Sequence, residues 1–159
     1  MKPESFSLRP ATLEDLDAVV KIENQVHAAP WTEEHFRAEL TKPYSQFLVF
    51  TDDESDSIIA GYLVFWVMFD ECQILNLATS LNYRGLGLAK QMIQKVVSIA
   101  LKKGIKKVVL DVRKSNSPAI QLYQRVKFSI THIRKGFYSN GEDAYQMTLN
   151  LEGEILPDL

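Results

Sequence analysis

The chain has 159 residues, of which 46% are hydrophobic and 24% charged, a composition typical of one soluble globular domain. Its 18 Lys and Arg against 20 Asp and Glu give a net charge of -2, which argues against a nucleic-acid-binding protein held by bulk positive charge. A single cysteine excludes an internal disulfide, and three scattered histidines show no zinc-ligand spacing.

Hydropathy along the chain gives no sign of a membrane or secretory protein. No apolar run approaches the ~20 residues that cross a bilayer, and the segment MKPESFSLRP has no apolar signal core. We therefore expect a cytoplasmic protein with no nucleic-acid or membrane partner. A single domain is expected over residues 1–159, with 152–159 as a frayed tail.

Hydrophobic spacing and capping residues predict the elements of the first half of the chain. Alternation over residues 6–10 predicts a short strand. Thr12, with Asp15 three residues later, approximates a capping box before a helix over 16–26. Thr32 is expected to cap a second short helix. Three strands are predicted next, at 46–51, 58–69 and 71–79, with turn-like segments at 52–56 and 69–71.

A helical period begins after these strands. Apolar residues within 89–100 recur at i, i+3, i+4 and i+7, and Gly104 is expected to close this helix. A buried strand is predicted over 106–112. Ser117, followed by a proline, is expected to cap another helix. Two last strands are predicted near 128–137 and 144–151, joined by a hairpin turn at 139–142. The order β-α-α-β-β-β-α-β-α-β-β predicts a mixed α/β domain.

The turn that follows residues 71–79 is the most informative segment. It leads into a helix whose first turn is expected to read Gly-x-Gly-x-Ala, at Gly85, Gly87 and Ala89. Small residues let a ligand approach the backbone, and the unpaired N–H groups of a helix start point outward. With Arg84, the positive helix end favours a phosphate or pyrophosphate site. The spacing fits neither the Walker A loop nor the dinucleotide fingerprint, and a tight turn without a ligand is the alternative.

This turn resembles the Arg/Gln-x-x-Gly-x-Gly/Ala pattern of the GNAT superfamily of N-acetyltransferases, in which the loop grips the pyrophosphate of acetyl-CoA. Four other segments match the superfamily: I-L-N-L-A at 74–78, L-D-V-R-x-S-N-x-x-A-I-x-L-Y at 110–123, E-D-A-Y-x-M at 142–147 and A-P-W-T at 29–32. The resemblance implies the GNAT acyltransferase fold, three-layer α/β/α with a mixed, mostly antiparallel sheet that is splayed at the acetyl-CoA site. It also implies acetyl-CoA as cosubstrate and no metal.

Within the superfamily, the motifs are similar to those of bacterial enzymes that acetylate the N-terminal alanine of ribosomal protein S18. The resemblance therefore implies acetyl transfer to the α-amino group of a protein N-terminal segment, by direct amine attack. Two other functions stay open. One is a GNAT enzyme for a small-molecule amine, and the other is an acetyl-CoA-binding module with weak catalysis. The segments A-P-W-T and E-D-A-Y-x-M favour acetylation of a protein N-terminus over these two alternatives.

The resemblance assigns catalysis to Asp111 and Tyr123. Asp111 stands where the superfamily usually has a general-base Glu, and its reach is shorter by about 1.5 Å, which favours a base acting through water. A salt bridge at the strand end is the alternative. Tyr123 matches the tyrosine that protonates the coenzyme A thiolate, because a phenol with a pKa near ~10 is protonated at neutral pH. Packing on its helix is the alternative for Tyr123. A second departure, Lys127 where the superfamily favours Gly, is expected to affect only a turn.

The same resemblance assigns coenzyme contacts to one strand end, the glycine-rich turn and one helix. The residues are Leu77, Ala78, Thr79, Arg84, Gly85, Leu86, Gly87, Leu88, Ala89, Asn116 and Tyr123. Backbone groups of the strand end would bind pantetheine and polarise the thioester oxygen. Asn116 would hydrogen-bond the pantetheine arm or order water there, or it is simply a helix-entry residue.

Acceptor contacts are less specific. Four carboxylates either line an entrance for a basic N-terminal segment or are simply solvated: Asp70, Glu71, Glu142 and Asp143. Tyr138 and Tyr145 are expected to shape a peptide groove, and Trp31 and Phe36 to be core or acceptor-wall residues. Cys72, without a matched histidine, is expected to be a small buried hydrophobe.

Overall fold

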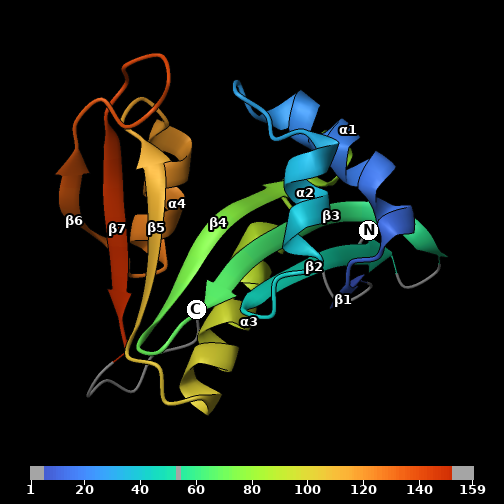
Figure 1. Ribbon diagram of the computed structural model, residues 1–159, viewed down its shortest axis with the longest axis horizontal. Helices are drawn as coiled ribbons and strands as arrows, with labels where there is room; N and C mark the ends of the chain where they lie inside the picture. Colours follow the sequence, from blue (N-terminus) through green and yellow to red (C-terminus); the bar gives the residue numbers. More distant parts are fainter. Residues whose placement is uncertain (1–5, 53–54, 152–159) are drawn as a thin grey trace. The chain divides into compact units, whose positions relative to one another are not determined.

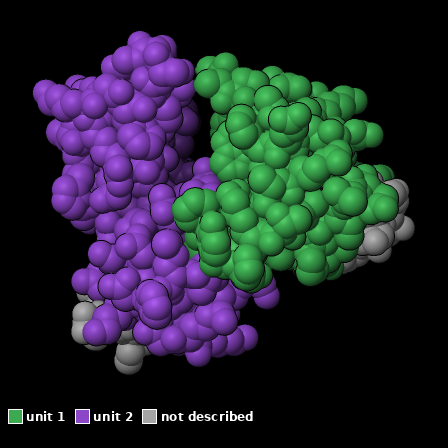
Figure 2. All heavy atoms as spheres, viewed as in Figure 1, with its two compact units in different colours: residues 1–66, 76–92 green, residues 67–75, 93–159 purple. Residues whose placement is uncertain are grey.

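The computed structural model describes residues 6–52 and 55–151. The chain divides into two compact units, one formed by residues 1–66 and 76–92 and the other by residues 67–75 and 93–159 (Figure 2). Each unit joins two separate stretches of sequence. The expected single domain over 1–159 stays a prediction, and the expected tail at 152–159 lies outside the described residues.

The order of helices and strands is the predicted one, with two added 3-10 turns (Figure 1). The elements are β1 (Phe6–Pro10), η2 (Leu13–Asp15), α1 (Leu16–Val26), α2 (Glu33–Glu39), β2 (Ser45–Asp52), β3 (Ser55–Val67), β4 (Glu71–Thr79), η3 (Leu81–Tyr83), α3 (Leu88–Lys102), β5 (Lys107–Arg113), α4 (Ser117–Arg125), β6 (Ser129–Arg134) and β7 (Ala144–Asn150). No helix among these described elements is long and apolar enough to span a membrane.

The strands form a mixed sheet of seven in the order β1-β2-β3-β4-β5-β7-β6. β4 and β5 pair in parallel, whereas β1–β2, β2–β3, β5–β7 and β6–β7 pair antiparallel. The parallel pairing runs from Glu71↔Lys107 to Ile74↔Leu110 and stops there, although both strands continue. The expectation of a mixed, mostly antiparallel sheet is confirmed.

Several predicted boundaries were wrong by a few residues. β3 begins at Ser55, which pairs with Asp52, and not at residue 58 as expected; residues 53–54 lie outside the described ones. α3 begins at Leu88, so Gly85 and Gly87 precede the helix instead of forming its first turn. The cap of α4 is Asn116 and not Ser117.

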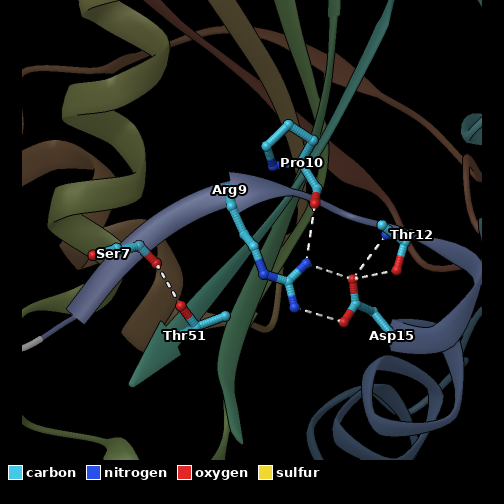
Figure 3. A network of polar contacts seen from close by, with 6 residues as sticks. All are labelled: Ser7, Arg9, Pro10, Thr12, Asp15 and Thr51. Carbon is cyan, nitrogen blue, oxygen red and sulfur yellow. Dashed lines mark hydrogen bonds and ion pairs between the residues drawn. The ribbon is translucent and has the colours of Figure 1, made fainter. Parts of the chain in front are cut away.

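Arg9 and Asp15 fix the end of β1 to the turn that starts α1 (Figure 3). Arg9 donates two parallel hydrogen bonds, Nη1 to Oδ2 at 2.8 Å and Nη2 to Oδ1 at 2.9 Å. Oδ2 of Asp15 also accepts from the backbone N–H of Thr12 at 2.8 Å, which confirms the reciprocal contact expected of the capping box. These contacts, with that of Arg9 the largest, lower the pKa of Asp15.

An aromatic cluster forms the core of the first unit. The Phe36 side chain is fully buried, and its ring centroid lies 5.1 Å from Trp31, 5.6 Å from Phe47 and 5.4 Å from Tyr62. Aromatic pairs at such separations stabilise a core beyond simple area burial. Phe36 is therefore a core residue, one of the two roles expected for it. This core supports the segment 29–32, which matched the superfamily.

The second unit has its core on β5, β7 and α3. Val108, Val109 and Leu110 are all buried, as the continuous apolar run predicted. Met147 and Leu149 of β7 are buried as well. This packing fixes the strand that carries Asp111, which directly follows the apolar run.

Candidate active site

The glycine-rich segment 84–89 lies in the first unit, where residues 84–87 connect η3 to α3 and residues 88–89 begin α3. Gly85 and Gly87 have φ angles of 81° and 77°, a left-handed conformation that favours glycine. A β-carbon added at either glycine would meet no atom within 4 Å, so open space lies beside both. Arg84 is exposed in the same turn. Open backbone, an exposed cation and the start of a helix of 15 residues fit the pyrophosphate of acetyl-CoA.

The strand end expected to bind pantetheine is held close to β3 by Gly61. A β-carbon on Gly61 would lie 2.7 Å from the carbonyl oxygen of Ala78 and 3.4 Å from Cα of Thr79. The backbone N–H of Ser80 donates to the carbonyl of Ala60 at 2.8 Å. Sequence reasoning missed Gly61, since a glycine inside a strand only signals that some backbone comes near.

A buried carboxylate network, also missed, lies behind the same strand. Glu23 is 1% exposed and accepts hydrogen bonds from the Tyr62 hydroxyl, from Asn76 Nδ2 at 3.0 Å and from the backbone N–H of Trp31 at 2.9 Å. Nε2 of His27 lies 3.6 Å from Oε1 of Glu23. Burial raises the pKa of Tyr62, and the Glu23 charge raises it further, so this phenol remains a donor. Glu23 thus links α1, the 29–32 segment, β3 and β4.

Asp111 lies on β5 in the second unit, opposite Gln146 of β7. Its side chain is 15% exposed, and Nε of Arg134 lies 3.1 Å from Oδ1. This contact is an ion pair outside hydrogen-bond geometry, so the buried Oδ1 has no hydrogen-bond partner among the described residues. Burial raises the pKa of Asp111, and the Arg134 charge offsets part of that rise. The alternative salt bridge is therefore present, and Oδ1 retains the capacity to accept a hydrogen bond.

Tyr123 lies half-buried on α4 of the same unit, with its ring centroid 5.9 Å from that of Phe128. Burial, with the nearby Tyr138, raises the pKa of Tyr123 to about 12, so the phenol is protonated throughout the neutral range. Burial also raises the pKa of Tyr138, and the charge of Asp111 raises it further. Tyr138 therefore lies within electrostatic range of both predicted catalytic residues.

Contacts within the 110–123 and 138–146 segments fix the surroundings of these groups. Glu142 accepts from Nη1 of Arg113 at 3.0 Å and from the backbone N–H of Ser115 at 2.9 Å. The Arg113 guanidinium carbon lies 4.0 Å from the centroid of the Tyr138 ring. Asp143 Oδ1 accepts from the backbone N–H of Gly136 at 2.9 Å. Both carboxylates thus hold loops in place, a role that neither alternative of the sequence analysis included.

Other predicted residues have structural partners or simple exposure. Oδ1 of Asn116 accepts from the backbone N–H of Ala119 at 3.3 Å and caps α4, as its helix-entry alternative predicts. Cys72 is fully buried, and burial raises the pKa of its thiol to about 11, which confirms a buried hydrophobe. Tyr145 is half-buried on β7, Asp70 is exposed, and Glu71 is half-buried. Within residues 6–52 and 55–151, no group of three or more His, Cys, Asp and Glu is placed to hold a metal ion.

Comparison with known proteins defines the class. The model of the acetyltransferase (GNAT) family matches residues 16–128. The ribosomal protein bS18-alanine N-acetyltransferase of Escherichia coli K12 is 30% identical over 138 residues, which are 85% of this chain and 90% of that protein. A Bacillus subtilis relative, provisionally named for the same activity, is 37% identical over 147 residues, or 91% of this chain and 95% of its own. The crystal structure of the E. coli ribosomal-protein-S18-alanine N-acetyltransferase superposes with a TM-score of 0.81 at 27% identity, covering 94% of this chain and 99% of that one.

The chain therefore belongs to the GNAT family of acetyltransferases and has the GNAT fold. It is an acetyl-CoA-dependent N-acetyltransferase, and the two relatives above are named as ribosomal protein bS18-alanine N-acetyltransferases, one of them provisionally. The expectations of family, fold, enzyme class and cosubstrate are confirmed. The assignments of individual site residues stay predictions.

Proposed function

We propose that this enzyme acetylates the N-terminal α-amino group of a protein, with the N-terminal alanine of ribosomal protein S18 as its acceptor. The observation that carries the proposal is the 37% identity to a relative provisionally named for this acceptor, over 91% of the chain. The two motifs that favour a protein acceptor, at 29–32 and 142–147, both lie within ordered, hydrogen-bonded segments.

Binding of the cosubstrate is assigned to the first unit. Arg84 and the backbone N–H groups at the start of α3 hold the pyrophosphate, since Gly85 and Gly87 leave the backbone open. Backbone groups of residues 77–79 orient the pantetheine arm and donate to the thioester oxygen. When bound, acetyl-CoA supplies the activated acetyl group.

Proton transfers are assigned to Asp111 and Tyr123. Asp111 takes the proton that the amine loses, through a water that donates to the unsatisfied Oδ1. An α-amino group titrates near ~7.7–8.0, so a modest base suffices near neutral pH. The neutral nitrogen then bonds to the acetyl carbon while the carbon–sulfur bond breaks, and Tyr123 donates its phenolic proton to the leaving sulfur. The second proton that the nitrogen loses on becoming an amide restores the Tyr123 phenol. The pKa of Tyr123, about 12, keeps this proton available.

An acetylation assay tests the proposal. The purified protein is incubated with acetyl-CoA and a peptide of the alanine-initiated S18 N-terminus. Matched reactions contain the same peptide with a blocked α-amino group, and a panel of polyamines, amino acids and aminoglycosides. We expect acetyl on the free α-amino group, located by mass spectrometry, and none on the blocked peptide. Faster turnover of a small amine than of the free peptide would contradict the proposed acceptor.

A further inference from the structure

Arg134 is the cation that contacts the predicted base. It lies on β6, 23 residues after Asp111 in sequence, and its Nε lies 3.1 Å from Oδ1. Resting on the proposed function, we propose that Arg134 is a positioning residue for acetyl transfer, which holds the Asp111 carboxylate ionised and in a fixed orientation. Neither the sequence motifs nor the names of the relatives assign it a role.

Other charged and titratable groups near Asp111 are engaged differently. Arg113, two residues along β5, pairs with Glu142 at 3.0 Å and stacks over Tyr138. Tyr138 is a neutral phenol at neutral pH, because burial and the nearby carboxylates raise its pKa. On β7, the residue opposite Asp111 is the uncharged Gln146. Among the described residues, the ion pair of Asp111 is therefore with Arg134.

The geometry of the pair suits a base better than a purely structural bridge. A side-by-side arginine and carboxylate with two parallel hydrogen bonds uses both oxygens, as Arg9 and Asp15 do here. Arg134 instead approaches Oδ1 through Nε outside hydrogen-bond geometry. The cation thus stabilises the ionised carboxylate and leaves its lone pairs available for the water that carries the proton.

Because Asp111 is partly buried, its carboxylate needs a nearby cation to stay ionised. A carboxylate with a 15% exposed side chain loses much of its hydration, which favours the protonated form that cannot accept a proton. A cation within ion-pair distance opposes that effect. Arg134 is itself 44% exposed, so its own charge remains solvated and the pair does not require full burial of both ions.

The first test is a carboxyl carbon NMR titration of Asp111, assigned by the loss of its signal in Asp111→Asn. In Arg134→Gln we expect the titration midpoint of Asp111 to rise by about one pH unit. This is the low end of the range of pKa changes for an aspartate that loses an adjacent arginine, and we expect the low end because Arg134 is partly exposed. Arg134→Lys retains the charge and should restore most of the shift. Lys135→Gln removes the neighbouring cation as a control, and its midpoint should stay at the parent value. An unshifted midpoint in Arg134→Gln would overturn the proposal.

The second test asks whether Arg134 acts through Asp111. Arg134→Gln should lower kcat at least about ten-fold, since small misplacements of a catalytic group have effects of this size or larger. In an Asp111→Asn background the same change should add no further loss, because the group that it positions is gone. Additive losses would show that Arg134 acts independently of Asp111 and would overturn the proposal. A parent protein that acetylates no peptide contradicts the proposed function instead, whatever the titration shows.

Discussion

The carbonyl oxygen of Ala78 lies 2.7 Å from the position that a β-carbon on Gly61 would occupy. Glycine at this position therefore allows β3 to approach the part of β4 that is predicted to bind pantetheine. The same β-carbon would lie 2.6 Å from Cε of Met92, but that atom is the end of a flexible side chain. The Ala78 carbonyl, in contrast, can shift only if the backbone of β4 moves with it.

Gly61→Ala is accordingly expected to lower the free energy of unfolding by about 1–3 kcal/mol through overpacking. It should also weaken coenzyme binding, because the Ala78 carbonyl must shift. Urea denaturation and calorimetric titration measure the two effects. In a Met92→Ala background most of the stability loss should persist, since the backbone clash remains. Complete relief in that background would show that the side chain, and not the carbonyl, sets the spacing.

Gly87→Glu is expected to weaken acetyl-CoA affinity at least about ten-fold, because it adds an anion beside the pyrophosphate. Gly104→Glu is the matched control: its φ angle of 68° is also left-handed, and a β-carbon there also meets no atom within 4 Å. Both variants should therefore lose similar stability, and the affinity loss should be confined to Gly87→Glu. Calorimetric titration of the folded variants decides; equal affinities would remove the pyrophosphate assignment.

Tyr123→Phe is expected to lower kcat by about 10²–10⁴-fold with little change in coenzyme affinity, because it removes one proton donor and almost no volume. Tyr44→Phe serves as the control, because Tyr44 is an exposed tyrosine that directly precedes β2. Single-turnover measurements isolate the chemical step. Because the pKa of Tyr123 is about 12, its ionisation should produce no falling limb in the parent profile between about pH 6 and 10. Parent-like turnover of the Phe variant would make Tyr123 a packing residue.

Asp111→Asn is expected to reduce kcat/KM most at the acidic end of a range from about pH 6 to 9, where the acceptor is mainly ammonium. At higher pH the amine is already neutral, and the deficit should shrink. Asp111→Glu, which restores the superfamily's usual residue, should preserve activity if the packed strand accepts the added methylene. A deficit that is constant across the range, or absent, would count against Asp111 as a base.

Stability provides an independent reading of the same residue. Burial raises the pKa of Asp111, so the folded state favours the protonated form. The contribution of Asp111 to stability is then present at low pH and is lost as the pH rises through the folded pKa. Asp111→Asn should consequently not lower Tm at neutral pH. A clear loss of Tm there would indicate that the ion pair with Arg134 is mainly structural.

Among the described residues, Lys127 is the only residue other than glycine with a left-handed backbone, at a φ angle of 79°. It stands in the turn after α4, where the superfamily favours glycine. Left-handed conformation costs a residue with a β-carbon about 1–2 kcal/mol, part of which glycine recovers. Lys127→Gly should therefore raise stability by up to about 1 kcal/mol, with unchanged kcat. Urea denaturation measures the gain, and a loss would mean that the side chain makes a compensating contact.

Local sequence signals predicted the elements well because they depend on neighbours in the chain. The apolar spacing within 89–100 buries one face of α3, whereas the continuous run in β5 buries both faces of that strand, and both were correctly assigned. Boundaries were less accurate where backbone pairing extends a strand past its apolar pattern, as at Ser55. The choice between Asn116 and Ser117 as a cap depended on which side chain reaches the Ala119 N–H, and spacing alone does not determine this.

Contacts between distant segments were not predicted. Glu23 and Asn76 are separated by 53 residues, and nothing in the α1 pattern marks Glu23 as other than a helix-surface carboxylate. The signal available was its position on the apolar stripe with Leu16 and Val19, where an acid requires buried donors. Arg134 likewise follows an ordinary strand pattern, and its role depends on the register that brings β6, β7 and β5 together.

β6 is the last strand in the sheet order, and all six of its residues are exposed. Ile130 and Ile133 are 41% and 56% exposed, so this edge combines apolar side chains with backbone groups that face solvent. Charged residues on such edges prevent pairing with a second chain. Arg134 supplies that protection at the end of the strand. A neutral side chain there should promote self-association. Light scattering should therefore detect larger particles for Arg134→Gln than for Arg134→Lys at equal concentration. Arg134, proposed above to position Asp111, would then also keep the protein from self-associating.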